Sequence, residues 1–217
     1  MAAAGIDLKI LVALATAVVA IELLAVLFGT SLSAHSLITT GAARSCQILV
    51  IVLVLFAADG NLSAIGIRLA SLKRGLQRGL IWSVGFGLVA ALAAVFIYSA
   101  GTDPFSLIRS RLPANAVHIF LLFAVGGVIG PMAEEVIFRG LLYGYFRRWG
   151  VVPALLISTG IFVLIHLLAR PVPGFAITQA IGGVVFAVSN ELEKNLMVPR
   201  TIHCLGNMAI FTIPLFV

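Results

Sequence analysis

Charged side chains are scarce in this chain. Asp, Glu, Lys and Arg make up 10% of its 217 residues, and hydrophobic residues make up 61%. Soluble domains average about 25% charged and roughly 45–50% apolar residues. A soluble core of this size has no use for so much apolar surface, so the composition excludes an ordinary aqueous domain. It predicts an all-α fold, a polytopic transmembrane helix bundle surrounded by the lipid bilayer.

Cysteine is also rare, which limits the candidate chemistry. The two cysteines, Cys46 and Cys204, lie in apolar segments without the spacing of a metal site. Cys204 directly follows His203, and neighbouring helix residues point in different directions, which argues against a Cys–His nucleophile pair. The net charge of +6 could suggest nucleic acid. However, the basic residues cluster in short loops and form no stripe with aromatic residues, so we expect no nucleic-acid partner.

The apolar residues fall into segments of about the 20 residues that a membrane helix needs. They predict about seven membrane helices, at Leu8–Phe28, Ser36–Ala58, Leu80–Ala100, Ala116–Phe146, Val151–Leu168, Phe175–Val188 and Val198–Phe216. The pair Gly130–Pro131 should kink or divide the fourth helix. The mixed basic segment Asn61–Gly79 predicts a short interfacial helix. The chain contains no internal repeat or linker, so we expect one integral-membrane unit.

Orientation follows from the distribution of Lys and Arg between the loops. One side collects Lys9, Arg68, Lys73, Arg74, Arg78, Arg147, Arg148, Lys194 and Arg200. The other side collects Arg44, Arg109, Arg111 and Arg170. The first side should be cytoplasmic, which places the N-terminus in the cytoplasm. We expect a multi-pass protein of the bacterial cytoplasmic (inner) membrane.

Polar residues inside three of the apolar segments are the main functional signal. The fourth predicted span contains Glu134, Glu135 and Arg139, the fifth contains His166, and the seventh contains His203 with Asn207. A charged side chain at bilayer depth costs at least about 2.5–3.5 kcal/mol, so such groups pair, face a water-filled cavity or take part in chemistry. Together they predict an active site inside the bundle.

The spacing of these residues indicates a division of roles. Glu135 and Arg139 are four residues apart and can form an ion pair on one helix face, which leaves Glu134 free for chemistry. Phe162 and His166 are also four apart, and Phe162 would pack beside the site. His166 could hold a water molecule against Glu134.

The third pair, His203 and Asn207, is also four residues apart. These two side chains could donate hydrogen bonds to an oxyanion. Counted from the cytoplasmic face, Glu134 and His166 both lie about 20 Å deep, whereas His203 and Asn207 lie only about 8–14 Å deep. Helix tilt, a kink at Gly130–Pro131 or a re-entrant stretch could close that gap. Alternatively, Glu134, His166 and His203 could hold a divalent metal such as zinc.

At these residues the chain resembles the CPBP family of intramembrane proteases, which includes type II CAAX prenyl endopeptidases and bacterial Abi proteins. The E-E-x-x-x-R motif matches Glu134 to Arg139, F-x-x-x-H matches Phe162 to His166, and H-x-x-x-N matches His203 to Asn207. Each motif alone is weak, but their order on separate apolar segments is specific. The resemblance implies N-terminal helices with a basic interfacial segment at 1–115 and a catalytic core at 116–217.

What the resemblance implies is a CAAX protease-like endopeptidase, either glutamic or metal-dependent. Glu134 and His166 would activate water, and His203 and Asn207 would hold the oxyanion. The substrate would be a membrane-embedded or lipidated protein or peptide, cut near its C-terminus or membrane segment. The alternative is a non-enzymatic membrane protein, either a transporter or an immunity or secretion scaffold. The absence of a duplicated half argues against a transporter.

Overall fold

A computed structural model describes residues 6–28, 34–59, 61–105, 113, 115–169 and 173–216. Within these ranges the chain is helical and contains no strand. The α-helices are α1 (Leu8–Phe28), α2 (Ala34–Asp59), α3 (Leu72–Ser99), α4 (Ala116–Leu121), α5 (Gly130–Glu135), α6 (Gly144–Phe146), α7 (Val151–Ala169), α8 (Pro173–Glu193) and α9 (Met197–Thr212). The predicted all-α class is confirmed.

Shorter helical turns connect these elements. Two π-helical stretches are η3 (Leu122–Ile129) and η4 (Val136–Tyr143), and the 3-10 turns are η1 (Ser63–Ile65), η2 (Leu69–Ser71), η5 (Arg147–Trp149) and η6 (Ile213–Leu215). Six helical segments in the described part are long and apolar enough to cross a membrane. Helix α9, the seventh predicted span, has 16 residues and is not among those six.

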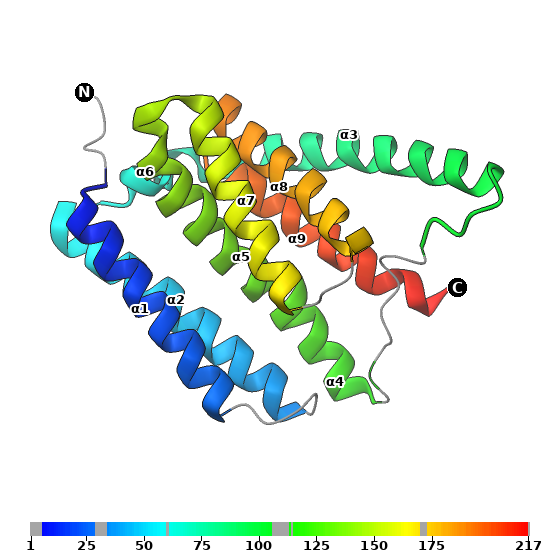
Figure 1. The fold of residues 1–217 in the computed structure, drawn as a ribbon, viewed down its shortest axis with the longest axis horizontal. Helices are drawn as coiled ribbons and strands as arrows, with labels where there is room; N and C mark the ends of the chain where they lie inside the picture. The colour runs from blue at the N-terminus through cyan, green and yellow to red at the C-terminus, as the bar shows by residue number, and fades with distance from the viewer. Residues whose placement is uncertain are drawn as a thin grey trace.

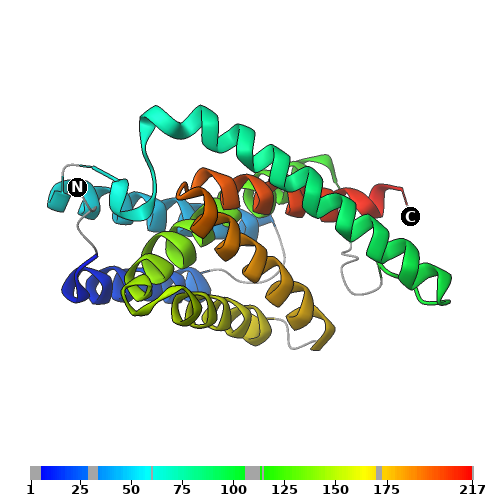
Figure 2. The same cartoon turned by 90° about the horizontal axis from the view of Figure 1, so that it is seen from above.

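The helices form two parts that lie side by side. Helices α1 and α2 pack against each other, and α5, α7, α8 and α9 form the rest of the bundle (Figure 1). Helix α3 packs along α9, but its second half extends beyond the other helices (Figure 2). Its side chains there are exposed, including Leu92 and Phe96. This surface is suited to lipid rather than water.

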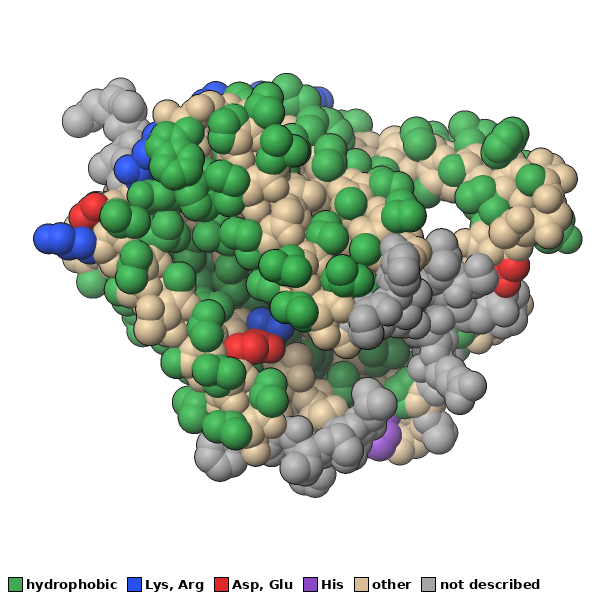
Figure 3. Space-filling view, viewed as in Figure 1, with side chains coloured by type: hydrophobic (Ala, Val, Ile, Leu, Met, Phe, Trp, Pro, Cys, Tyr) green, Lys and Arg blue, Asp and Glu red, His purple; other side chains and the backbone are tan. Residues whose placement is uncertain are grey.

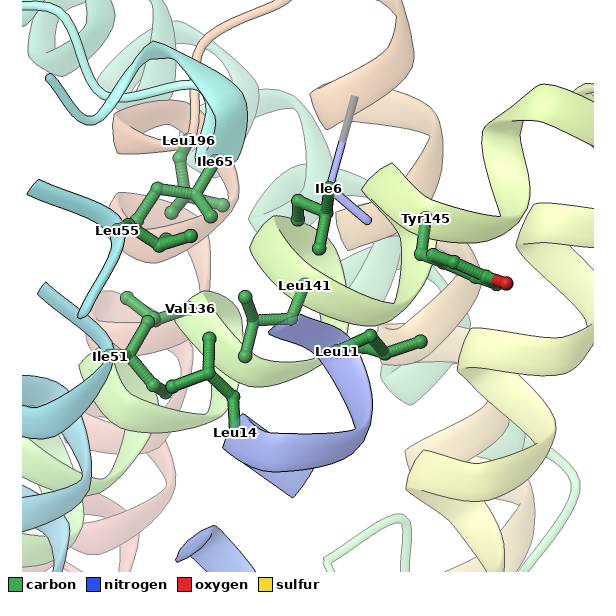
Figure 4. Close-up of a cluster of buried hydrophobic side chains, with 10 residues drawn as sticks. All are labelled: Ile6, Leu11, Leu14, Ile51, Leu55, Ile65, Val136, Leu141, Tyr145 and Leu196. Carbon is green, nitrogen blue, oxygen red and sulfur yellow. The ribbon is translucent and has the colours of Figure 1, made fainter. Parts of the chain in front are cut away.

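A buried apolar cluster joins the two parts. It is formed by side chains from both ends of the sequence (Figure 4), namely Ile6, Leu11, Leu14, Ile51, Leu55, Ile65, Val136, Leu141, Tyr145 and Leu196. Glycine allows one close approach here, because a Cβ on Gly140 would lie 3.0 Å from Cβ of Ile65. The cluster fixes η1 and the start of α9 against η4, the helical stretch that follows the two glutamates.

The fourth span is one helical segment from Ala116 to Trp149, close to its predicted bounds. Gly130–Pro131 therefore does not divide the helix, and a kink there stays a prediction. The π-helical stretch η3 precedes Pro131, which lacks an N–H and cannot bond to the carbonyl four residues earlier. The interfacial segment, in contrast, is shorter than predicted, because α3 begins at Leu72.

The basic residues assigned to one side gather at one end of the bundle. Arg148 Nη2 donates to the carbonyl of Ile6, and the Leu196 amide donates to the carbonyl of Gly66. In Figure 3, Lys and Arg side chains lie at the upper and left edges and at one point near the centre beside an acidic side chain, and much of the remaining surface is apolar. The membrane side that this end faces stays a prediction. Arg109, Arg111 and Arg170 lie outside the described residues.

Arg44, which was assigned to the opposite loops, lies inside α2 and pairs with Glu22 of α1. Its Nη1 is 2.9 Å from Glu22 Oε2, and the buried Gln47 amide also donates to that oxygen. Polar side chains that satisfy one another in this way are typical contacts between membrane helices. Charged side chains therefore also pair between the helices of the α1–α2 hairpin.

Candidate active site

Glu134 lies at the centre of the candidate site, on α5. Its Oε2 is 3.8 Å from Nε2 of His166 on α7 and 3.7 Å from Nε2 of His203 on α9. The side chains of Glu134 and His166 keep 18% and 22% of their exposure, so the site is recessed but accessible. Both separations exceed a direct hydrogen bond and suit a contact through one water molecule.

Glu135, unlike Glu134, is fully buried. Its Oε1 accepts a hydrogen bond from Arg139 Nη1 at 3.0 Å, and neither side chain is exposed. The predicted internal ion pair is therefore present. Arg139 also donates through Nη2 to the carbonyl of Gly183 on α8, and its guanidinium lies 4.8 Å from the centre of the Phe162 ring. These contacts offset the cost of burying the charges.

Both histidines are held through Nδ1. His166 Nδ1 is 2.8 Å from the carbonyl of Phe162, and His203 Nδ1 is 2.7 Å from Oε1 of Glu135. A backbone carbonyl accepts hydrogen bonds only, so Nδ1 of His166 carries a proton. In the neutral ring this leaves Nε2 as an acceptor facing Glu134. The carboxylate of Glu135 fixes His203 in the same manner.

Aromatic rings enclose the imidazoles. Phe162 is fully buried, and its ring centre lies 4.3 Å from that of His166. Phe186 of α8 stacks on His203 with a centroid distance of 4.5 Å and an interplanar angle of 19°. This packing restricts ring rotation and aims Nε2 of His203 at the carboxylate.

Asn207 is the member of the predicted set that the structure places apart from this cluster. Its Nδ2 donates to the carbonyl of Gly126 in η3 at 2.9 Å. That bond uses one of the two N–H groups of the amide and leaves the other available. Asn207 therefore joins α9 to η3, one helical turn from His203.

The depth mismatch expected for His203 does not keep it from Glu134, because Nε2 of His203 lies 3.7 Å from Oε2 of Glu134 and the start of α9 is covered by protein. Leu196 is fully buried, and Asn195 is 6% exposed. Asn195 Nδ2 donates to the Ser71 carbonyl, so the segment before α3 covers the start of α9. Val198 is itself fully buried and is therefore not an exposed edge from which the depth of His203 can be counted.

Several contacts in the site were not predicted from the sequence. The hydrogen bond between Glu135 and His203, the acceptor role of Gly183 and the stacking of Phe186 all link residues on different helices. Of the contacts made by Glu135, the four-residue spacing predicted only its ion pair with Arg139. Phe186 and Gly183 lie in an apolar helix without a distinguishing pattern.

The suggested metal ligands have the right donor atoms, and their Nδ1 atoms are held as in many zinc-bound histidines. Among the residues that the structure describes, however, no group of three or more His, Cys, Asp or Glu side chains is placed to hold an ion. The side chains therefore do not fit a metal in their present positions.

Fold and site together define a helical membrane protein with a recessed carboxylate–imidazole centre. Comparison with known proteins agrees, since residues 116–209 match the family model "Type II CAAX prenyl endopeptidase Rce1-like". The resemblance carried by the three motifs is confirmed over this segment, which includes all seven predicted site residues.

The chain is also similar to a protein that is named a CAAX protease. Over 130 residues the chain is 28% identical to the membrane-embedded CAAX protease MroQ of Staphylococcus aureus (strain USA300), covering 56% of this chain and 50% of the relative. The matched part of this chain thus spans about half the length of that relative. No solved structure matches.

Proposed function

We propose that the protein is an intramembrane endopeptidase that cleaves a membrane-embedded or lipidated protein or peptide by means of water activated by Glu134. The observation that carries the proposal is the convergence of Glu134 Oε2 with the Nε2 atoms of His166 and His203 at 3.8 and 3.7 Å. The family match over residues 116–209 and the CAAX protease activity in the relative's name support the same reaction class.

Glu134 and His166 supply the groups that water activation needs. A water molecule between them would donate its two hydrogens to Oε2 of Glu134 and Nε2 of His166, which directs its oxygen lone pair outward. Glu134 would take one proton as that oxygen attacks the peptide carbonyl carbon. Glu134 would then return the proton to the leaving amine as the C–N bond breaks.

His203 and Asn207 would stabilise the negative charge on the carbonyl oxygen. Asn207 has one N–H group left after its bond to Gly126. Because Nδ1 of His203 already donates to Glu135, Nε2 can donate only when both ring nitrogens carry protons. Preorganised donors of this kind contribute roughly 10²–10³-fold to rate.

The test compares membrane proteins from cells that carry wild type, Glu134→Gln or Glu22→Gln. Mass spectrometry should find a trimmed tail or fragment in wild type and Glu22→Gln cells but not in Glu134→Gln cells. Glu22 is a matched control, because it is also a carboxylate on a membrane helix but belongs to the α1–α2 pair.

Two results would reject the proposal. One is a product that persists in the Glu134→Gln cells at equal protein abundance. The other is the absence of any product in the wild type while Glu134→Gln changes transport or association, which would favour a non-enzymatic transporter or scaffold.

A further inference from the structure

The segment of residues 63–78, called the basic segment below, carries cations that the proposed reaction does not use. Arg68, Lys73 and Arg74 are exposed. In the part of the chain that the structure describes, no carboxylate lies within ion-pair distance of any of the three. Their charges therefore remain available to a ligand outside the protein.

The neighbouring carboxylates are already paired with other cations. Glu193 pairs with Arg78, at 2.6 Å between Oε1 and Nη2. Glu191 pairs with Arg147 and Lys194, at 3.0 and 2.5 Å. The excess positive charge at this end of the bundle is thus concentrated on the basic segment, which makes it complementary to an anionic surface.

The basic segment also exposes apolar side chains next to these cations. Leu69 is 85% exposed and Leu76 is 46% exposed. Leucines beside Lys and Arg are typical of a segment that lies at the boundary between headgroups and acyl chains. A soluble anion would satisfy the cations but leave these leucines in water.

Hydrogen bonds hold the basic segment rigidly against the bundle. Asn195 Nδ2 donates to the Ser71 carbonyl at 3.0 Å, and the Leu196 amide donates to the Gly66 carbonyl at 3.1 Å. Gly66 has a φ of 75°, a conformation that favours glycine. The cations are therefore presented from a fixed surface beside the start of α9.

We propose that the basic segment is a binding site for anionic phospholipid headgroups, in which Arg68, Lys73 and Arg74 contact the phosphates and Leu69 and Leu76 enter the acyl region. Each Lys or Arg near an anionic membrane surface favours binding by roughly fivefold, so the three cations should together contribute on the order of 100-fold.

The test measures lipid retention on the intact protein by native mass spectrometry, with phosphatidylglycerol and phosphatidylcholine offered together in detergent. Wild type should retain phosphatidylglycerol preferentially. Lys73→Gln should weaken its retention roughly fivefold, and Arg68→Gln/Lys73→Gln/Arg74→Gln roughly 100-fold. Lys194→Gln is the matched control, an exposed lysine at the same end that pairs with Glu191, and should bind as wild type does.

Three outcomes would overturn the site. The first is equal retention of the two lipids by wild type, and the second is an equal loss in Lys73→Gln and Lys194→Gln. The third is equally tight binding of inorganic phosphate, which would indicate a soluble anion instead of a headgroup. Glu134→Gln should retain lipid as wild type does, so this test is independent of the proposed protease activity.

Discussion

Oε1 of Glu135 lies 2.7 Å from Nδ1 of His203, although 68 residues separate them in the chain. The same oxygen accepts the hydrogen bond from Arg139. One carboxylate therefore neutralises a buried guanidinium and fixes an imidazole on another helix. Glu134, its neighbour, bonds to neither the guanidinium nor Nδ1 of His203, and its Oε2 faces the Nε2 atoms of His166 and His203 in the accessible part of the site.

The two glutamates should respond differently to the same substitution. Glu134→Gln should lower activity by roughly 10²–10⁴-fold because it removes the proposed general base. It should leave stability almost unchanged because Glu134 is not part of the buried ion pair. Glu135→Gln leaves the Arg139 charge uncompensated and should destabilise the protein by about 3–5 kcal/mol. Cleavage rates and thermal unfolding in detergent measure the two effects, and equal unfolding temperatures would contradict this division.

Arg139 should matter for stability much more than an arginine in an exposed ion pair. Arg139→Ala leaves Glu135 buried without its partner and should cost about 3–5 kcal/mol in the free energy of unfolding. Arg147→Ala is the matched control, because Arg147 is 42% exposed in its pair with Glu191 and should contribute about 0–1 kcal/mol. Denaturant unfolding of both variants should separate them, and similar losses would argue against a special role for the buried pair.

Alanine should be tolerated at position 183 only if the neighbouring Thr159 becomes smaller. A Cβ at this position would lie 2.8 Å from Cγ2 of Thr159 and 3.5 Å from Nη2 of Arg139. Gly183→Ala should therefore destabilise the protein by about 1–3 kcal/mol through overpacking. Adding Thr159→Ser removes the clashing methyl group and should restore much of the loss.

Gly160→Ala is the control for this effect, because no atom lies within 4 Å of a Cβ there. In a helix this change should be neutral or stabilise by roughly 0.5–1 kcal/mol. Thermal unfolding of the wild type and these three variants tests the assignment. A double variant that is no more stable than Gly183→Ala would show that Thr159 is not the obstacle.

Asn207 should affect stability modestly and catalysis strongly. Asn207→Ala removes the hydrogen bond to the Gly126 carbonyl, which should cost about 1 kcal/mol. If the second N–H group stabilises the oxyanion, kcat should fall by roughly 10²–10³-fold while KM changes little. A fall in kcat of less than about tenfold would assign Asn207 a purely structural role.

The sequence allowed the helices to be located because their apolar lengths match a bilayer, and α1 begins and ends at the predicted residues. The Glu135–Arg139 pair was also predictable, since it depends on spacing within one helix. Contacts between helices were harder to predict. The stacking of Phe186 on His203 depends on the rotation of α8 against α9, which no pattern in either segment specifies.

The covered start of α9 escaped prediction for a related reason. The charged turn that ends at Lys194 indicates a membrane surface, but Asn195 and Leu196 are held beneath the segment before α3. Hydropathy shows which residues are apolar, but it does not show whether lipid or another part of the protein covers them. The approach of His203 to Glu134 was therefore set by tertiary contacts that a count along the chain cannot include.

The two π-helical stretches on either side of α5 make the geometry of the site depend on the exact number of residues in this helical segment. Each π turn spans an extra residue relative to an α turn. Removing one residue from η3 would permit regular α-helical bonding but rotate the preceding turns by about 100° relative to Glu134. The Gly126 carbonyl would then leave Asn207 although every side chain of the three sequence motifs was unchanged. Insertions and deletions in this helix should therefore be tolerated less well than substitutions.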